Sequence, residues 1–333
     1  MGTPETGTES DNMDNFASEQ DAKRAAKMFS ALVNNISINI KGKNPIVHLS
    51  CVCLFAGGHL LIEDVPGVGK TTLAKSLSES LGLKQSRIQF TPDLLPGDVI
   101  GTSIFNQETN SFEFKPGPVF SNVLLADEIN RASPKTQSAL LESMEERNVT
   151  YDGVTHKLPS PHMVIATQNP IELGGTYALP EAQLDRFMMS LSMGYPSAAD
   201  EAMILQDAIS KQKLDAVITL DDFFEIQKIA ETIFVSPIVT DYIVALSQAT
   251  RANTSVALGV SPRGSLAIYK AAQVLALSLG RHYVIPDDIK ALAPKIWEHR
   301  LILTPRAKLD GTKRFDVIQT TIAGIEVPTL KES

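Results

Sequence analysis

A short glycine-rich segment, residues 64–72, carries the residue types that bind a polyphosphate. It reads Asp-Val-Pro-Gly-Val-Gly-Lys-Thr-Thr and follows the apolar run 60–62. Glycines let successive backbone N–H groups turn toward phosphates, and the N-terminus of a following helix adds partial positive charge. Lys70 is expected to reach the β- and γ-phosphates, and Thr71 to offer its hydroxyl to Mg²⁺. The expected nucleotide-binding residues of this segment are Pro66, Gly67, Val68, Gly69, Lys70, Thr71 and Thr72.

This segment departs from the usual phosphate-loop pattern at one position. Asp64 stands five residues before Gly69, where the pattern has its first glycine. A glycine-rich turn with an incidental lysine is the non-functional alternative. Residues 66–71 nevertheless keep the turn, the close approach of the backbone and the positive charge that a phosphate needs, so the nucleotide site is favoured.

Two further apolar runs end in side chains suited to nucleotide hydrolysis. Residues 123–126 lead into Asp127 and Glu128, and residues 163–166 lead toward Asn169. Asp127 is expected to hold Mg²⁺ through water, and Glu128 to polarise the attacking water. Asn169 can position water near the γ-phosphate. Solvated acids at a strand end and a turn-forming Asn are the alternatives, but the order of these runs after the phosphate loop favours catalysis.

At these positions and at others the chain resembles the MoxR-type AAA+ ATPases. The resemblance extends over roughly residues 30 to 300, and the family tolerates Asp at the position of Asp64. It implies an α/β fold: an AAA+ P-loop three-layer α/β/α core with a smaller C-terminal all-α lid domain. The segments that carry the resemblance are residues 63–72, 89–98, 127–132, 166–170, 179–187 and 261–263.

The resemblance also assigns roles to residues outside these catalytic runs. Ile40 and Gly42, in the turn between the first two expected helices, would contact the adenine ring of ATP. Arg263 would swing onto the phosphates when the lid closes. An arginine at a helix N-terminus is electrostatically disfavoured, which supports an anionic partner for Arg263.

Two further arginines are candidates for a site shared between subunits. In related ATPases an arginine at the position of Arg186, at the end of an expected helix 180–187, reaches the γ-phosphate of the neighbouring subunit. Arg131, which follows the acidic pair, is a second candidate for a contact with the neighbour. The alternative for each arginine is a local salt bridge, for example with Asp185 or Glu128. An arginine that acts on a neighbour implies a homo-oligomeric ring, for which we expect a hexamer.

The pattern divides the chain into three parts: a disordered acidic tail 1–22, a nucleotide-binding core 23–195 and a helical lid 196–333. The tail has six acidic residues and no Lys or Arg. From residue 197 onward helices alone are expected, except for strand-like runs at 315–318 and 320–322. Two hairpins, 103–114 and 148–158, are inserted in the core. In the resembling family such insertions protrude from one face of the ring toward a client or adaptor.

Composition limits the class of protein. The chain has 333 residues, 43% of them hydrophobic, which is enough for two domains. A net charge of −8 argues against a sequence-independent grip on nucleic acid. The sequence has no apolar run of about 18 residues and no basic-then-apolar leader, so we expect a cytoplasmic protein without membrane insertion. Cys51 and Cys53 lie in an apolar segment and are expected to be reduced core residues.

The sequence therefore predicts an enzyme that hydrolyses ATP to ADP and phosphate, with Mg²⁺, in an oligomeric ring. The resemblance implies that the ring remodels, matures or activates a partner protein in a chaperone-like manner, often together with a von Willebrand factor A domain protein. The alternatives are the motor subunit of a chelatase-type cofactor-insertion complex and a DNA-translocating motor. A DNA motor would need more basic or aromatic pore hairpins than residues 148–158 offer. The set Asp127, Glu128 and Asn169 disfavours a non-hydrolysing switch.

Overall fold

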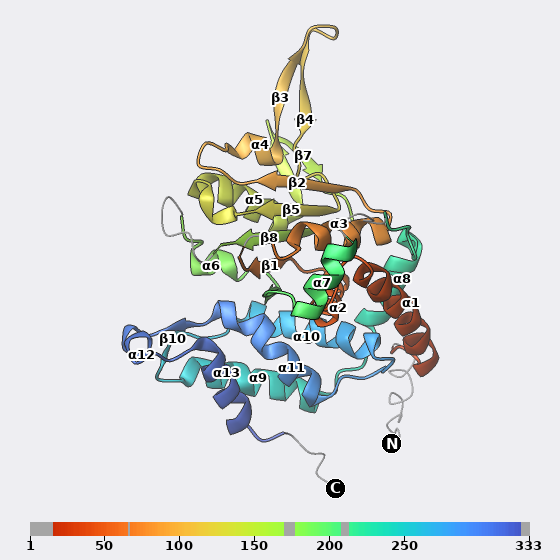
Figure 1. The fold of residues 1–333 in the computed structure, drawn as a ribbon. Coiled ribbons are helices and arrows are strands. Elements are labelled where there is room, and N and C mark those ends of the chain that lie inside the picture. The colour runs from red at the N-terminus through yellow and green to blue at the C-terminus, as the bar shows by residue number, and fades with distance from the viewer. Residues whose placement is uncertain (1–15, 66, 170–176, 208–212, 328–333) are drawn as a thin grey trace, which may run out of the picture.

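The computed structural model describes residues 16–65, 67–169, 177–207 and 213–327 (Figure 1). Pro66 of the phosphate loop and residues 1–15 of the predicted acidic tail lie outside this described part. The chain forms a sheet-containing core with a hairpin that projects from one end, and a helical region that packs against the opposite end (Figure 1).

A five-stranded parallel sheet forms the centre of the core, in the order β2-β5-β8-β1-β9. Its register places Gln89 beside Asp127 and Glu63 beside Gln168, so the polar carboxyl ends of four strands meet at one edge. The strands are β1 (Leu60–Glu63), β2 (Gln85–Gln89), β5 (Val123–Asp127), β8 (Met163–Gln168) and β9 (Met189–Leu191).

Alternation along the buried strands separates two hydrophobic layers. Val123 and Leu125 face one side of the sheet, where they pack with the buried residues of α1 (Glu19–Ser37), α2 (Asn44–Phe55) and α3 (Lys70–Ser80). Leu124 and Ala126 face the other side, where they pack with those of α5. Side chains of a strand point alternately to opposite faces, so helices are needed on both. The predicted three-layer α/β/α core is confirmed.

Capping residues set where the core helices begin. Ser18 precedes α1 and accepts from the backbone N–H of Asp21, and Ser133 precedes α5 in the same way. The first helix therefore starts at Glu19, inside the predicted acidic tail 1–22. The helical segments of the core are α1 (Glu19–Ser37), α2 (Asn44–Phe55), α3 (Lys70–Ser80), α4 (Pro96–Ile100), η2 (Ile129–Arg131), α5 (Pro134–Glu146) and α6 (Glu181–Leu184).

The C-terminal region is a helical lid, and five of its helices begin with a Ser or Thr cap or with an early proline. Its longest helix, α10, also packs against α1 and α2 of the core. Trp297 is fully buried and donates its indole N–H to the Gly264 carbonyl at 3.1 Å. The helical segments are α7 (Ala198–Asp207), α8 (Leu220–Glu231), α9 (Pro237–Ala252), α10 (Pro262–Ser278), α11 (Pro286–Trp297), η3 (Glu298–Arg300), α12 (Pro305–Leu309) and α13 (Arg314–Gly324).

Three predictions of secondary structure after residue 180 are wrong. The runs 315–318 and 320–322, predicted as strands, belong to helix α13, because Val317, Ile318 and Thr321 share one buried helix face. Packing on α9 and α11 overrides the β preference of these residues. The lid is also not purely helical, since β10 (Val256–Leu258) and β11 (Ile302–Leu303) pair antiparallel. The helix predicted at 180–187 is only α6, Glu181–Leu184.

Both predicted hairpins are confirmed. The first, β3 (Gly101–Asn106) with β4 (Ser111–Pro116), projects beyond the sheet (Figure 1), and the second is β6 (Asn148–Tyr151) with β7 (Val154–Lys157). Asp152 and Gly153 both have positive φ, as a two-residue hairpin turn requires. The rings of Phe114 and His156 stack at 4.3 Å, which joins the two hairpins.

None of the helices in the described residues combines the length and the apolar character needed to cross a membrane.

The packing of α2 leads to a prediction about its two thiols. Cys51 and Cys53 are free and fully buried, as predicted, and burial raises the pKa of Cys51 to about 12 and that of Cys53 as well. Because the thiolate is the reactive form, an aromatic disulfide reagent at pH 8 should titrate both thiols only after denaturation. Rapid reaction of the native protein would contradict this packing.

Candidate functional site

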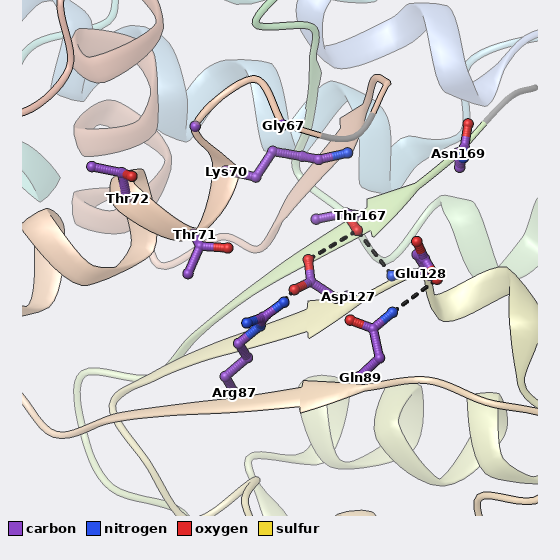
Figure 2. Close-up of a pocket in the computed structure, with 11 residues that line it drawn as sticks. Gly67, Lys70, Thr71, Thr72, Arg87, Gln89, Asp127, Glu128, Thr167 and Asn169 are labelled. Carbon is purple, nitrogen blue, oxygen red and sulfur yellow. Dashed lines mark hydrogen bonds and ion pairs between the residues drawn. The ribbon is translucent and has the colours of Figure 1, made fainter. Parts of the chain in front are cut away.

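A cavity of about 290 Å³ lies at the carboxyl edge of the sheet (Figure 2). The phosphate loop and the start of α3 form one wall, and the ends of β2, β5 and β8 form the other. The edge is thus occupied by residues that lie far apart in the sequence. The lining residues are Gly67, Gly69, Lys70, Thr71, Thr72, Arg87, Gln89, Asp127, Glu128, Thr167 and Asn169.

The phosphate loop has the backbone that its glycines predict. Gly67 and Gly69 have φ of 86° and 100°, a region that favours glycine, and Gly69 is the N-cap of α3. Val68 packs against the hydrophobic core and does not line the cavity. The Lys70 amine donates to the carbonyl of Asp64 at 2.8 Å. Burial lowers the pKa of Lys70, and the nearby negative charges of Asp64, Asp127 and Glu128 oppose this shift.

Asp64, the departure from the usual pattern, has a defined structural role. One of its carboxylate oxygens accepts from the Ser192 hydroxyl at 3.1 Å, from the Gly194 N–H at 2.8 Å and from the Met193 N–H. The other accepts from the Val65 N–H at 3.2 Å. The side chain is buried, so these donors satisfy it in place of water. Asp64 therefore joins the phosphate loop to the chain that leaves β9 for the lid.

Asp127, the predicted Mg²⁺ ligand, is held from two sides. One carboxylate oxygen accepts from Arg87 Nε at 2.7 Å, and the other from the Thr167 hydroxyl at 3.3 Å (Figure 2). Thr71, the other predicted ligand, lines the same cavity. Mg²⁺ in nucleotide sites is commonly bound through one or two protein oxygens, water and phosphates, and these two residues fit that pattern.

Glu128, the predicted water-activating residue, has an unusual backbone. Its φ of 55° and ψ of 48° are left-handed, which is rare for a residue other than glycine and is found disproportionately at functional sites. Its N–H donates to the Thr167 hydroxyl at 2.9 Å, which helps to hold this conformation. The side chain accepts from Gln89 at 2.8 Å (Figure 2) and from Arg131 at 3.1 Å. Arg131 thus forms the local salt bridge with Glu128 that was the alternative to a contact with the neighbouring subunit.

The remaining predicted residues lie at different places. Asn169 follows β8, is buried and lines the cavity. Ile40 and Gly42 do not line it: Ile40 is buried in the hydrophobic core, and Gly42 lies against the carboxylate of Asp200 at the start of the lid. The predicted adenine contacts therefore lie at the junction of core and lid.

Arg186 and Arg263 are brought together in a second cavity of about 300 Å³, which also contains Glu145. Both bind Glu145: Arg186 Nε lies 3.0 Å from one carboxylate oxygen, and Arg263 Nη2 bonds the other. In this conformation Arg263 does not line the cavity of Lys70, so it does not face the phosphate loop of its own subunit. Instead it lines the same cavity as Arg186 and bonds the same carboxylate.

Sequence reasoning missed Arg87, Gln89, Thr167 and Glu145. The first two lie on β2, and their partners lie about 40 residues along the chain. Gln89 is the first residue of one segment that resembles the family, and Thr167 lies inside another. The resemblance therefore included both residues, but neither was assigned a role. No local pattern identified Glu145, since its partners Arg186 and Arg263 lie 41 and 118 positions away in the sequence.

Two family models match the chain: "ATPase family associated with various cellular activities (AAA)" over residues 59–189, and "AAA lid domain" over residues 248–321. The chain is 44% identical to Chaperone MoxR1 of Mycobacterium tuberculosis, over 87% of this chain and 79% of that protein. It is 49% identical to YeaC of Bacillus subtilis, over 90% of this chain and 95% of that protein. The crystal structure of a proposed ATPase from Cytophaga hutchinsonii superposes with a TM-score of 0.87 at 35% identity, covering 97% of this chain and 100% of that one.

The buried contacts of Asp64 give a stability prediction. An Asn at this position has the same shape, but its amide group faces at least one backbone N–H, so Asp64→Asn should lower the free energy of unfolding by about 1–3 kcal/mol. Asp64→Gly, which restores the usual pattern, should also destabilise. Glu63→Gln is the matched control, since Glu63 is exposed and its carboxylate accepts from the Ser190 hydroxyl at 3.2 Å. Denaturant unfolding measures all three, and a wild-type value for Asp64→Asn would contradict the role.

Proposed function

We propose, starting from the fact that this chain belongs to the MoxR-type family of AAA+ ATPases, that it hydrolyses ATP to ADP and phosphate. The observation that carries the proposal is the convergence of Lys70, Thr71, Asp127, Glu128 and Asn169 on one cavity. Each of these side chains has the type and the placement that one part of phosphoryl transfer to water requires.

The residues divide the work of the reaction. Glu128 accepts a proton from the water that attacks the γ-phosphorus. The bond from that phosphorus to the oxygen that bridges the β- and γ-phosphates breaks, and ADP leaves with that oxygen. Lys70 leaves the Asp64 carbonyl to bind the phosphates, and Asn169 orients the water. Thr71 and Asp127 would hold Mg²⁺, which supplies charge neutralisation of the phosphates when bound.

Gln89 and Arg87 set the starting state of this machinery. Gln89 binds the Glu128 carboxylate and Arg87 binds that of Asp127, so both acids are occupied before nucleotide arrives. Hydrolysis requires Glu128 to turn from Gln89 toward the water. Because the Glu128 backbone is fixed by Thr167, this movement needs only a change in the side chain.

We infer that the active form is a homo-oligomeric ring, a hexamer, in which Arg186 reaches the γ-phosphate bound by the neighbour. Arg186 and Arg263 lie in a cavity apart from their own phosphate loop, and this supports an action on another subunit. Arg263 is accordingly proposed to act beside Arg186 rather than on its own nucleotide. Arg131, paired with Glu128, is proposed to act within its own subunit.

The proposed task is remodelling or activation of a partner protein in the cytoplasm, with a von Willebrand factor A domain protein as adaptor. A relative that is 44% identical is named a chaperone, which supports a protein client. The projecting β3–β4 hairpin offers exposed Ile104, Phe105 and Phe112 as a contact surface. The net charge of −8 favours a protein over nucleic acid as the client.

Two substitutions test the proposed hydrolysis. Glu128→Gln should lower ATP turnover by about 10²- to 10⁴-fold with nucleotide affinity retained, because only the proton acceptor is lost. Lys70→Ala should instead weaken ATP binding about tenfold or more, since it removes a charged hydrogen-bond donor to phosphate. Phosphate release and titration with a fluorescent ATP analogue measure the two effects.

Glu146→Gln, the same change at an exposed position of α5, is the control for turnover and should match wild type. Wild-type turnover in Glu128→Gln would remove Glu128 from the reaction. Undiminished binding by Lys70→Ala would show that the cavity is not the phosphate site.

A further inference from the structure

A single carboxylate, that of Glu145, connects the two arginines with a proposed role between subunits. Glu145 lies in the last turn of α5, and each of its oxygens bonds one guanidinium, that of Arg186 at 3.0 Å and that of Arg263. Arg186 follows α6 in the core, whereas Arg263 lies in the first turn of the lid helix α10. The Glu145 side chain therefore bridges core and lid at one point.

The backbones of both arginines are anchored by neighbouring residues. Asp185, which precedes Arg186, accepts from Arg300 Nε at 2.7 Å and from the Ser261 hydroxyl at 3.0 Å. Ser261 in turn caps α10 two residues before Arg263. The side chains of Arg186 and Arg263 are nevertheless 28% and 46% exposed. The guanidinium groups can thus exchange their partner without movement of the chain that carries them.

The cavity around Glu145 has an excess of positive charge. Five Arg or Lys side chains and two carboxylates line it. Arg147 bonds the carbonyls of Gly57 and His162, and Arg300 bonds Asp185 and several carbonyls, so these two are committed to the fold. Glu145 is the carboxylate that opposes the two more exposed arginines. Guanidinium groups in such a setting also bind phosphate oxygens with favourable geometry.

We propose that Glu145 takes the place of the neighbour's γ-phosphate between Arg186 and Arg263, and is exchanged for it when an ATP-loaded subunit docks. This inference rests on the proposed intersubunit role of Arg186. A terminal phosphate carries more negative charge than a carboxylate and displaces it, whereas ADP presents no γ-phosphate. Glu145 is thus a positioning residue that opposes subunit association until the neighbour holds ATP.

The test measures ATP-dependent association of the full chain by light scattering over a range of protein concentrations, in the Glu128→Gln background that preserves ATP. Glu145→Gln should lower the concentration for half-maximal association about three- to tenfold, because the amide keeps the shape but removes two partly exposed ion pairs. Glu146→Gln, the same change at the next residue, should leave it unchanged. In an Arg186→Ala/Arg263→Ala background, Glu145→Gln should have no effect, because no arginine remains to be released.

The outcomes separate this inference from the ring proposal. A half-maximal concentration that is unchanged or higher in Glu145→Gln overturns the role of Glu145, and so does an equal shift in the arginine-free background. Failure of the parent protein to associate with ATP at all removes both the ring and the exchange. Association of the parent without a shift in Glu145→Gln removes the exchange alone.

Discussion

The parallel register of the central sheet is the constraint on which the site depends. It places Gln89 opposite Asp127, and Glu63 opposite Gln168, so four strands deliver their polar ends to one edge. The bonds of Thr167 to Asp127 and to the Glu128 N–H cross from β8 to β5 at this edge. A slip of one residue would turn these side chains to the opposite face, and the site would be lost.

The fold and the residues of the candidate site could be predicted where the sequence signal is local. The phosphate loop, the Asp127-Glu128 pair and both hairpins are contiguous patterns, and each lies where it was expected. Continuous apolar runs similarly predicted the buried strands β1, β5 and β8. The α13 segment was misread because its β-branched residues fit a strand equally well, and only packing on α9 and α11 selects the helix.

Residues whose role comes from distant partners could not be predicted. Asp64 departs from the glycine of the usual pattern, and its carboxylate accepts from the backbone N–H of Gly194, 130 positions away. Gln89 and Arg87 gain their partners from the pairing of β2 with β5. The sequence shows the types of these residues. It does not show the strand register, or the path of the chain between β9 and the lid, that brings them together.

The arrangement separates two functions in space. In the proposed function, one edge of the sheet binds and cleaves the nucleotide, and the second cavity, at the junction of core and lid, presents Arg186 and Arg263. In a single chain the two cavities share no lining residue, and in the proposed ring the second cavity of one subunit would lie against the first cavity of the next. Hydrolysis is then a property of the interface between subunits.

Subunit mixing tests this completion of the site most directly. Arg186→Ala and Glu128→Gln chains, each inactive alone, are combined over a range of ratios, with light scattering to confirm mixed assemblies. If Arg186 acts on the neighbour, turnover should recover where an Arg186→Ala subunit, with its intact Glu128, meets a Glu128→Gln subunit with its intact Arg186. A flat baseline at every ratio, in confirmed mixed rings, would contradict the shared site.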